Sequence, residues 1–400
     1  MKKENINSAA FWQAPAIQEE LIRLIMDLCA IPAPSGQEQK RADFINKWLS
    51  KECHINASID TACNVLVLLS QPDPKNSAIP KSPSRLPKDS GLSVFMAHTD
   101  TVFPDTGSLP VRRTEDRICS PGAGDDTACA AILMMFLKYG QPELKNCRKP
   151  LLFAFNSCEE GLGNLKGSRQ IIKDYSGKIC EVTSFDGGVK GICNHAVGSL
   201  RYQITVSTRG GHSYNDFGSR NAILVMSHLA ERLYRLQVPA EGRSTYNAGV
   251  ITGGTSVNTI AQSCRMLFEY RSDRKESLKL MQSFFFETLS ALQSDFPDIR
   301  LEYVLVGERP CMGDVDSARQ QALTERALAS IRKFTDAEEM SVIGSGSTDC
   351  NIPLSQGIPA ICFGGLLGEG VHTREEYVTI PLLLQEAAII SDYLLSALSL

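Results

Sequence analysis

The sequence predicts an α/β fold, a mostly parallel sheet with helices on both faces, together with an inserted ferredoxin-like α+β domain. Short apolar runs alternate with helical stretches over the first half of the chain, a pattern typical of parallel sheets. After Gly198 the order changes to β-α-β-β-α-β, which is typical of ferredoxin-like domains. The first pattern then resumes. We therefore expect one discontinuous domain at 1–198 and 309–400, interrupted by an inserted domain at 199–308.

Composition excludes several classes of protein. Of the 400 residues, 43% are hydrophobic, which is enough for a sizeable core. A net charge of −4 and an isoelectric point near 6.0 leave no basic excess, so we expect no nucleic-acid or membrane partner. Apolar runs are too short to span a bilayer, and the N-terminal segment lacks the apolar part of a signal peptide. Thirteen cysteines without a C-x-x-C pair predict free thiols in a reducing cytoplasm.

The first elements are two helices. Apolar residues recur every three or four positions from Ile17 to Leu28, which predicts a helix that ends before Pro32. Ser35 and Glu38 have the spacing of a capping box, which predicts that a second helix starts at this point. The proline-rich segment 71–91 is expected to be an exposed excursion.

The remaining elements follow from apolar periodicity and from turn residues. In the discontinuous domain we expect strands at His54–Ile59, Val65–Leu69, Leu92–Ala97, Leu151–Phe155, Val182–Phe185, Met340–Ile343 and Ala360–Phe363, and helices at Asp126–Tyr139, Asn164–Tyr175, 316–333 and 380–398. In the inserted domain we expect strands at Leu200–Ser207, Asn247–Thr252, Arg265–Arg271 and Arg300–Val306, and helices at Ser219–Leu236 and Glu276–Leu292.

Histidines and carboxylates follow the predicted strands of the discontinuous domain. The candidates are His98, Asp100, Asp125, Glu159, Glu160, Asp186 and His372. Open parallel sheets place their ligand sites at the carboxyl ends of the strands, so we expect these side chains to converge. Each of these short patterns alone is common on protein surfaces. Imidazole and carboxylate ligands together suit divalent metals, zinc above all. Two histidines and three or four of these carboxylates make at least five ligands, which are too many for one tetrahedral ion that also holds a water. Such a set favours two ions about 3.5–4 Å apart that share a carboxylate.

Six stretches resemble one known family. They are MAHTDTV, GAGDDTACAA, NSCEEGLGNLKGS, SFDGG, GGHSYNDFGSRNAI and GVHTREEYV. They are similar to the co-catalytic zinc peptidases and deacylases, a superfamily that includes peptidase T, carboxypeptidase G, aminoacylase and acetylornithine deacetylase. The resemblance runs in order from about Ile31 to Ile380.

The resemblance implies a set of metal ligands. By motif, His98 and Asp186 would hold one ion, Glu160 and His372 would hold the other, and Asp125 would bridge the two. The family also implies a cis peptide bond after Asp125. Zinc is the expected metal, with cobalt or manganese as alternatives.

The resemblance also implies catalytic roles. Asp100 would orient the imidazole of His98, and Glu159 would be the general base that activates a water bridging the metals. His212 would reach across a homodimer, formed by the inserted lid domain, to stabilise the oxyanion. The alternative for His212 is an ordinary loop histidine.

Substrate-binding residues follow by the same comparison. Asn258 and Arg271 match the family's substrate-binding positions, and Ser347 lies in the substrate-loop motif GSGSTD. Arg271 would clamp a substrate carboxylate through two hydrogen bonds. Two alternatives stay open, namely that Arg271 is only a strand-end salt-bridge residue and that GSGSTD is a plain turn.

The strings DDT and FDGG are nearer to the peptidase T branch than to the deacetylases, so we expect an exopeptidase that acts on short peptides. An N-acyl-amino-acid deacylase is the alternative because it shares all the metal residues. A catalytically silent binding protein would be expected to lack Glu159 or a ligand, and none is missing. Two departures affect only the subgroup: Thr127 replaces the family's lysine, and Cys158 replaces an acid. Cys158 is either redox-sensitive or a buried inert thiol.

Overall fold

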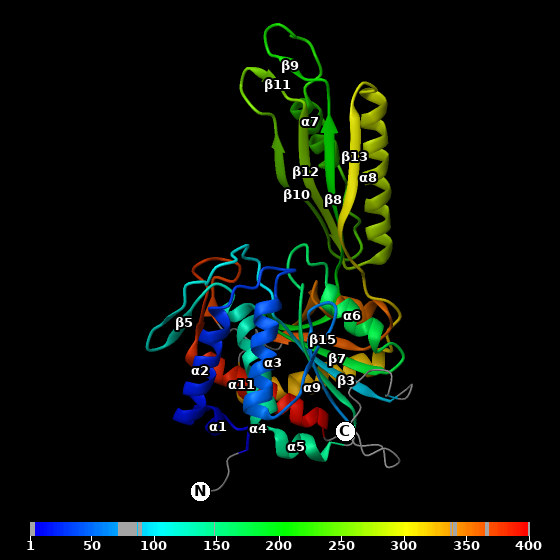
Figure 1. Cartoon of the computed structure of the whole chain (residues 1–400). Coiled ribbons are helices and arrows are strands. Elements are labelled where there is room, and N and C mark those ends of the chain that lie inside the picture. The colour runs from blue at the N-terminus through cyan, green and yellow to red at the C-terminus, as the bar shows by residue number, and fades with distance from the viewer. Residues whose placement is uncertain are drawn as a thin grey trace. The chain divides into compact units, whose positions relative to one another are not determined.

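The computed structural model describes residues 5–70, 86, 90–147, 149–336, 338, 342–364 and 368–398. The chain forms two compact units (Figure 1). One comprises Met1–His195 with Gly313–Leu400, and the other comprises Ala196–Met312. We call them the discontinuous unit and the inserted unit. The sequence-based bounds of the inserted domain, 199–308, lie within the second of these ranges.

A mostly parallel sheet forms the centre of the discontinuous unit. Its strands, in spatial order, are β1 (Ser58–Ile59), β2 (Val65–Leu69), β6 (Leu151–Asn156), β3 (Leu92–His98), β7 (Ile179–Ala196) and β14 (Ile343–Gly346), with β15 (Ala360–Gly364) paired to β7. Strand β3 is parallel to β6 and β7, and β15 is parallel to β7. Strand β2 is antiparallel to both β1 and β6. The predicted α/β class is confirmed.

Both faces of this sheet are covered. Phe95 and Phe153, on neighbouring strands, belong to one large core cluster with Phe136 of a helix. Val94 and Leu152, which alternate with them and so point to the other face, are also fully buried. Every residue of β3 and β6 is buried for this reason.

Helices and two short β elements complete the discontinuous unit. The helices are α1 (Ala9–Gln13), α2 (Pro15–Cys29), α3 (Gln39–Cys53), the π-helical turn η2 (Ala123–Thr127), α4 (Ala128–Tyr139), α5 (Gln141–Asn146), α6 (Lys166–Asp174), α9 (Ser317–Phe334), α10 (Asn351–Ser355) and α11 (Ile380–Leu398). A second, small sheet has the order β16 (Gly368–Glu369), β17 (Tyr377–Thr379), β5 (Arg117–Cys119) and β4 (Arg112–Arg113).

Two local predictions are wrong for tertiary reasons. The strand expected at His54–Ile59 is only Ser58–Ile59, because α3 continues to Cys53 and His54 ends it in a left-handed conformation with φ 56°. The capping box is absent, because α3 starts at Gln39 without a side-chain cap. Ser35 instead donates its hydroxyl hydrogen to Asp100, at 2.6 Å.

Two other predictions fall largely or partly on residues outside the described part of the chain. Of the excursion predicted at 71–91, only residues 86, 90 and 91 belong to the described part of the chain. The β-like stretch Met340–Ile343 also lies partly outside the described residues, and the observed strand β14 begins at Ile343.

The inserted unit has the predicted β-α-β-β-α-β order. An antiparallel sheet runs β10 (Ser244–Gly253), β12 (Ser263–Ser272), β8 (Gly198–Ser207) and β13 (Arg300–Arg309), with helices α7 (Ala222–Leu233) and α8 (Lys275–Asp295) and a separate short pair, β9 (Gly211–His212) with β11 (Thr259–Ile260). Tyr202, Phe268 and Phe285 stack at its core, joining both central strands to α8.

Helix α11 is long and apolar enough to cross a membrane by length and composition, but 67% of its apolar stretch is buried inside the protein. Tyr393 of this helix contacts the rings of Phe95, Phe185 and Phe363, which lie on strands of the sheet. Such burial is typical of a core helix.

Glu386 is the exception on this helix. Its side chain is 1% exposed, and neither carboxylate oxygen has a hydrogen-bond partner among the described residues. Burial raises the pKa of Glu386 to about 8. Because the folded-state pKa lies above the unfolded value, this group lowers the free energy of unfolding as pH rises from about 4.5 to 8.

We therefore expect Glu386→Leu to stabilise the protein by about 1–3 kcal/mol, with the larger gain at pH 8 and above. Urea unfolding at pH 5, 7 and 9 measures this difference. Glu325→Leu, an exposed position on α9, is the matched control and should show no such pH dependence. An equal effect of both substitutions at every pH would contradict the assignment of an unpaired acid.

Candidate active site

Asp125 lies between the two histidines that the sequence singled out. Its Oδ1 is 2.9 Å from Nε2 of His98, and its Oδ2 is 3.0 Å from Nε2 of His372. The same nitrogen of His372 is 3.1 Å from Oε1 of Glu160. Candidate ligand atoms of His98, Asp125 and Glu160 all lie within 4.8 Å of one another. The predicted ligands therefore converge, and one carboxylate faces two imidazoles with different oxygens.

Each of these side chains is positioned by the end of a different element. His98 is the last residue of β3, and Glu160 lies in the turn that follows β6. Asp125 lies in η2, which precedes α4, and its peptide bond to Asp126 is cis, as predicted. His372 follows β16 and has a φ of 66°. Parallel strands ending at one edge bring these distant segments together.

Asp186 lies at the same edge, beside a close backbone approach. Its Oδ1 accepts a hydrogen bond from the amide of Gly188, at 2.8 Å. A Cβ atom at position 188 would lie 2.7 Å from Oδ2 of Asp125 and 3.1 Å from Oδ1 of Asp186. Only glycine leaves room between the two carboxylates, which explains the FDGG string.

Buried carboxylates dominate the electrostatics of this site. Burial and the charge of Asp125 raise the pKa of Asp186 to about 7. Hydrogen bonds to Asp125 and Glu160 raise the pKa of His372 to about 10. Burial alone would lower the pKa of His98, but its hydrogen bonds to Asp100 and Asp125 raise it well above the ordinary value. The carboxylates therefore favour the protonated form of both histidines, and a divalent cation would compete with those protons for the same nitrogens.

Asp100 is more than a partner of His98. Nδ1 of His98 lies 3.1 Å from the carbonyl oxygen of Asp100 and 3.5 Å from its Oδ1. The two carboxylate oxygens of Asp100 accept the backbone amides of Glu159 and Glu160, each at 2.9 Å. Asp100 thus fixes the turn that carries the predicted base and a predicted ligand. The side chain of Glu159 itself is 7% exposed.

Cys158 is held by an acid that sequence reasoning placed in a helix cap. Oε1 of Glu38 accepts hydrogen bonds from the amide of Cys158 and from its thiol, at 3.1 and 3.2 Å. Burial and the nearby charge of Glu38 raise the pKa of the Cys158 thiol to about 12. The thiol therefore stays protonated, which favours the inert alternative.

Sequence reasoning missed two further residues of this site. The carboxylate of Asp126 accepts the backbone amides of His98 and Gly187, at 3.0 and 3.1 Å. The guanidinium of Arg41, which is 2% exposed, donates to the carbonyl of Thr99 at 2.8 Å. The only available signal for Asp126 was its place in the D-D pair, and Arg41 carried none.

The loop with Ser347 reaches the same edge of the sheet. Ser347 follows β14 and is half-buried. Two residues later, Asp349 accepts a hydrogen bond from Nδ2 of Asn156, at 2.5 Å. Asn156 is the last residue of β6, three positions before Glu159. Asp349 thus anchors this loop to the end of β6, and a role of Ser347 toward a substrate stays a prediction.

In the inserted unit, His212 and Asn258 are neighbours. His212 pairs with Thr259 across β9 and β11, and the amide of Ser213 donates to the carbonyl of Asn258. His212 and Asn258 are both exposed. Nδ1 of His212 accepts weak hydrogen bonds from the amides of Tyr214 and Asn215, at 3.3 and 3.4 Å.

Arg271 lies at the other end of this unit's sheet. It is paired in register with Ser199, at the start of β8, whereas His212 follows the end of that strand. Its guanidinium donates to both oxygens of Glu269, at 2.9 and 3.0 Å, and Glu269 also binds Arg201. The structure therefore shows Arg271 in an ion pair and does not bring it next to His212.

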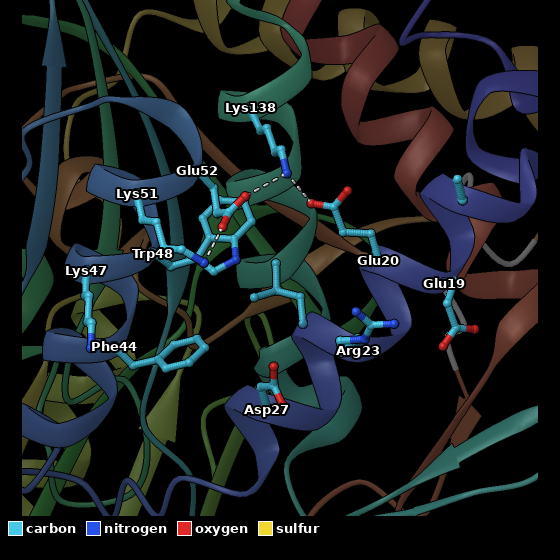
Figure 2. Close-up of a pocket in the computed structure, with 12 residues that line it drawn as sticks. Glu19, Glu20, Arg23, Asp27, Phe44, Lys47, Trp48, Lys51, Glu52 and Lys138 are labelled. Carbon is cyan, nitrogen blue, oxygen red and sulfur yellow. Dashed lines mark hydrogen bonds and ion pairs between the residues drawn. The ribbon is translucent and has the colours of Figure 1, made fainter.

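A separate cavity of about 740 Å³ lies between α2 and α3 (Figure 2) and is lined by no predicted site residue. Figure 2 shows Lys138 directed toward Glu20 and Glu52, at 2.6 and 3.1 Å. These opposite charges compensate one another. Imidazole and thiol groups are absent from its lining, so its chemistry does not resemble that of the cluster around Asp125.

Comparison with known proteins assigns the family. The sequence profile of peptidase family M20/M25/M40 matches residues 94–396, which include every predicted ligand. The chain belongs to this family. The resemblance inferred from the sequence motifs is thereby confirmed, and the chain is assigned to a family of enzymes that hydrolyse peptide and related amide bonds.

Individual relatives are distant. An acetylornithine deacetylase of Buchnera aphidicola (subsp. Schizaphis graminum) is 27% identical over 228 residues, which span 52% of this chain and 58% of the deacetylase. The fold is similar to that of a tripeptidase from Staphylococcus aureus Mu50, with a TM-score of 0.71, 18% identity and 96% and 99% of the two chains covered. It is also similar to a Bacillus subtilis protein described as a dinuclear metal-binding peptidase, with a TM-score of 0.61, 14% identity and 96% and 99% covered.

The protonated histidines of the cluster lead to a prediction about metal binding. Zinc added to metal-free protein at pH 7 should release about two to three protons per chain, because His98 and His372 must lose theirs to bind a cation and Asp186, with its pKa raised to about 7, is also partly protonated. Isothermal titration calorimetry in buffers of different ionisation enthalpy counts these protons.

The variant His372→Asn should release about one proton fewer than the wild type. His54→Asn, at an exposed position outside the cluster, is the control and should behave like the wild type. Equal proton release by all three proteins would show that zinc does not bind at this cluster.

Proposed function

We propose that this M20/M25/M40 family member is a two-metal exopeptidase that hydrolyses short peptides. The observation that carries this proposal is the carboxylate of Asp125, whose two oxygens face His98 and His372 at 2.9 and 3.0 Å. A single carboxylate placed between two imidazoles has the donor geometry of a bridging ligand.

The donor set fits two divalent ions. In this proposal His98 and Asp186 hold one, Glu160 and His372 hold the other, and Asp125 is shared. Imidazole and carboxylate ligands fit zinc, and cobalt or manganese are alternatives with the same ligand preferences. Such ions lower the pKa of a water and polarise the scissile carbonyl.

Glu159 is the proposed general base. It is next to the ligand Glu160, and its backbone is fixed by Asp100, so its position relative to the ligands is set by the same turn. It accepts a proton from the attacking water and then delivers it to the leaving amine. Burial of the Glu159 side chain strengthens its interaction with the reacting groups.

The substrate class is supported by the neighbours. The similar fold of a tripeptidase favours short peptides, and the deacetylase relative makes an N-acyl-amino-acid deacylase the second candidate. We propose that Asn258, Arg271 and Ser347 bind the substrate. Glu269 fixes the guanidinium plane of Arg271, which orients it for a substrate carboxylate.

We also propose a cytoplasmic homodimer joined through the inserted unit. Apolar side chains are exposed on α7 and on the edge strand β10: Ile223, Leu224, Val250 and Ile251 are 43%, 55%, 42% and 49% exposed. An exposed apolar face on an edge strand is a typical site of association. His212 of one copy would then serve the active site of the other.

Replacing the general base tests the mechanism, and a substrate panel tests the specificity. We expect the zinc-loaded wild type to hydrolyse tripeptides faster than N-acetyl amino acids. Glu159→Gln should lower kcat by about 10²–10⁴-fold and leave the metal content unchanged, because it removes a proton acceptor but no ligand. Chromatographic product analysis and metal analysis measure these outcomes.

Glu115→Gln, at an exposed position, is the control and should retain full activity. Hydrolysis of N-acetyl amino acids alone would exclude the peptidase in favour of the deacylase. Full activity of Glu159→Gln would exclude this residue as the base.

His212 provides a separate test of the dimer. His212→Ala should lower kcat by about 10²–10³-fold through loss of oxyanion stabilisation, whereas His228→Ala should not. Mixing and reassembling the His212→Ala and Glu159→Gln variants should restore about a quarter of the wild-type rate. Half of the dimers are then mixed, and each has one site with both residues intact. A monomer by light scattering, or no restoration on mixing, would disprove the shared site.

A further inference from the structure

Glu376 is a buried acid that none of the proposed catalytic steps uses. Its side chain is 1% exposed. Oε2 accepts the backbone amide of Gly122 at 2.8 Å, and Oε1 accepts those of Gly124 and Asp125 at 2.7 and 3.0 Å. All three donors belong to the segment that carries the proposed bridging ligand, including the amide of that ligand itself.

The backbone around Glu376 is attached to the same segment. The amide of Ser120 donates to the carbonyl of Glu376 at 3.0 Å. Directly beyond it, β17 pairs antiparallel with β5, with Tyr377 opposite Cys119. Residues 117–125 are therefore joined to residues 376–379 by both ladder and side-chain hydrogen bonds.

Glu376 also lies four residues after His372, so one short loop connects it to the second imidazole of the site. Its carboxylate binds the backbone amide of Asp125, and the loop places Nε2 of His372 3.0 Å from Oδ2 of the same aspartate. We therefore expect the distance between the carboxylate of Asp125 and His372 to depend on the position of the Glu376 side chain.

The fit around Glu376 is close and chemically specific. A Cβ atom at position 124 would lie 3.3 Å from Oε1 of Glu376 and 3.4 Å from a methyl group of Val378. Three amide donors need acceptors, and a carboxylate offers two oxygens and no hydrogen. A glutamine of the same shape would turn its NH2 group toward at least one of these donors.

We propose that Glu376 is a positioning residue, which sets the placement of Asp125 relative to His372. It thereby sets the metal affinity of the second position, the one formed by Glu160 and His372. This inference rests on the proposed two-metal function. Groups that orient metal ligands from behind change metal affinity by about 10–100-fold when they are replaced. Here the group acts through the backbone of the ligand rather than through its side chain.

Zinc titration of metal-free protein tests this proposal directly. We expect the wild type to bind two ions per chain, and Glu376→Gln to bind one ion as tightly as the wild type and the other about 10–100-fold more weakly. In the peptidase assay, excess zinc should restore much of the kcat of Glu376→Gln, which a merely destabilised protein would not show. Glu375→Gln, at the exposed neighbouring position, is the matched control and should bind both ions normally.

Gly124→Ala is the second variant, because its added methyl group would press on the same carboxylate from the donor side. Like Glu376→Gln, it should weaken binding of the second ion. It also provides the test if Glu376→Gln does not fold. Tight binding of two zinc ions by every folded variant would overturn the proposal for Glu376. A wild type that binds no second ion would overturn the two-metal function itself, so the two failures are distinguishable.

Discussion

The site depends on one carboxylate that faces two imidazoles. Oδ1 and Oδ2 of Asp125 meet His98 and His372, which come from segments far apart in the chain. A short aspartate side chain can serve both only if its own backbone is fixed. Glu376 fixes that backbone, because its carboxylate accepts hydrogen bonds from three amides of the segment that carries Asp125.

Buried acids that bind backbone amides recur around Asp125. Asp100, Asp126, Glu38 and Glu376 each accept hydrogen bonds from the backbone of a segment that carries a predicted ligand or lies next to one. A buried carboxylate is costly without hydrogen bonds, and backbone amides satisfy it without adding a full positive charge. The loops of the site are thereby fixed while the ligand cluster itself stays acidic.

The proposed metal ligands and most of the proposed substrate-binding residues lie in different units. The predicted metal ligands all lie in the discontinuous unit and would serve a peptidase and a deacylase equally well. His212, Asn258 and Arg271 lie in the inserted unit, where the exposed His212–Asn258 pair and the Arg271–Glu269 ion pair occupy opposite ends. We therefore expect selectivity between amide substrates to depend on residues that do not bind the metal.

Much of this protein could be predicted from its sequence. Apolar periodicity determined the alternation of strands and helices, and the positions of His98 and Asp186 after strands predicted their convergence, because parallel strands end at one edge. Tertiary structure alone decided the use of Ser35 and Glu38, which have the spacing of a helix cap but bind Asp100 and Cys158 instead. It alone revealed Glu376, whose partners lie some 250 residues away. Periodicity reports local burial, whereas a side chain's hydrogen-bond partner is set by the whole fold.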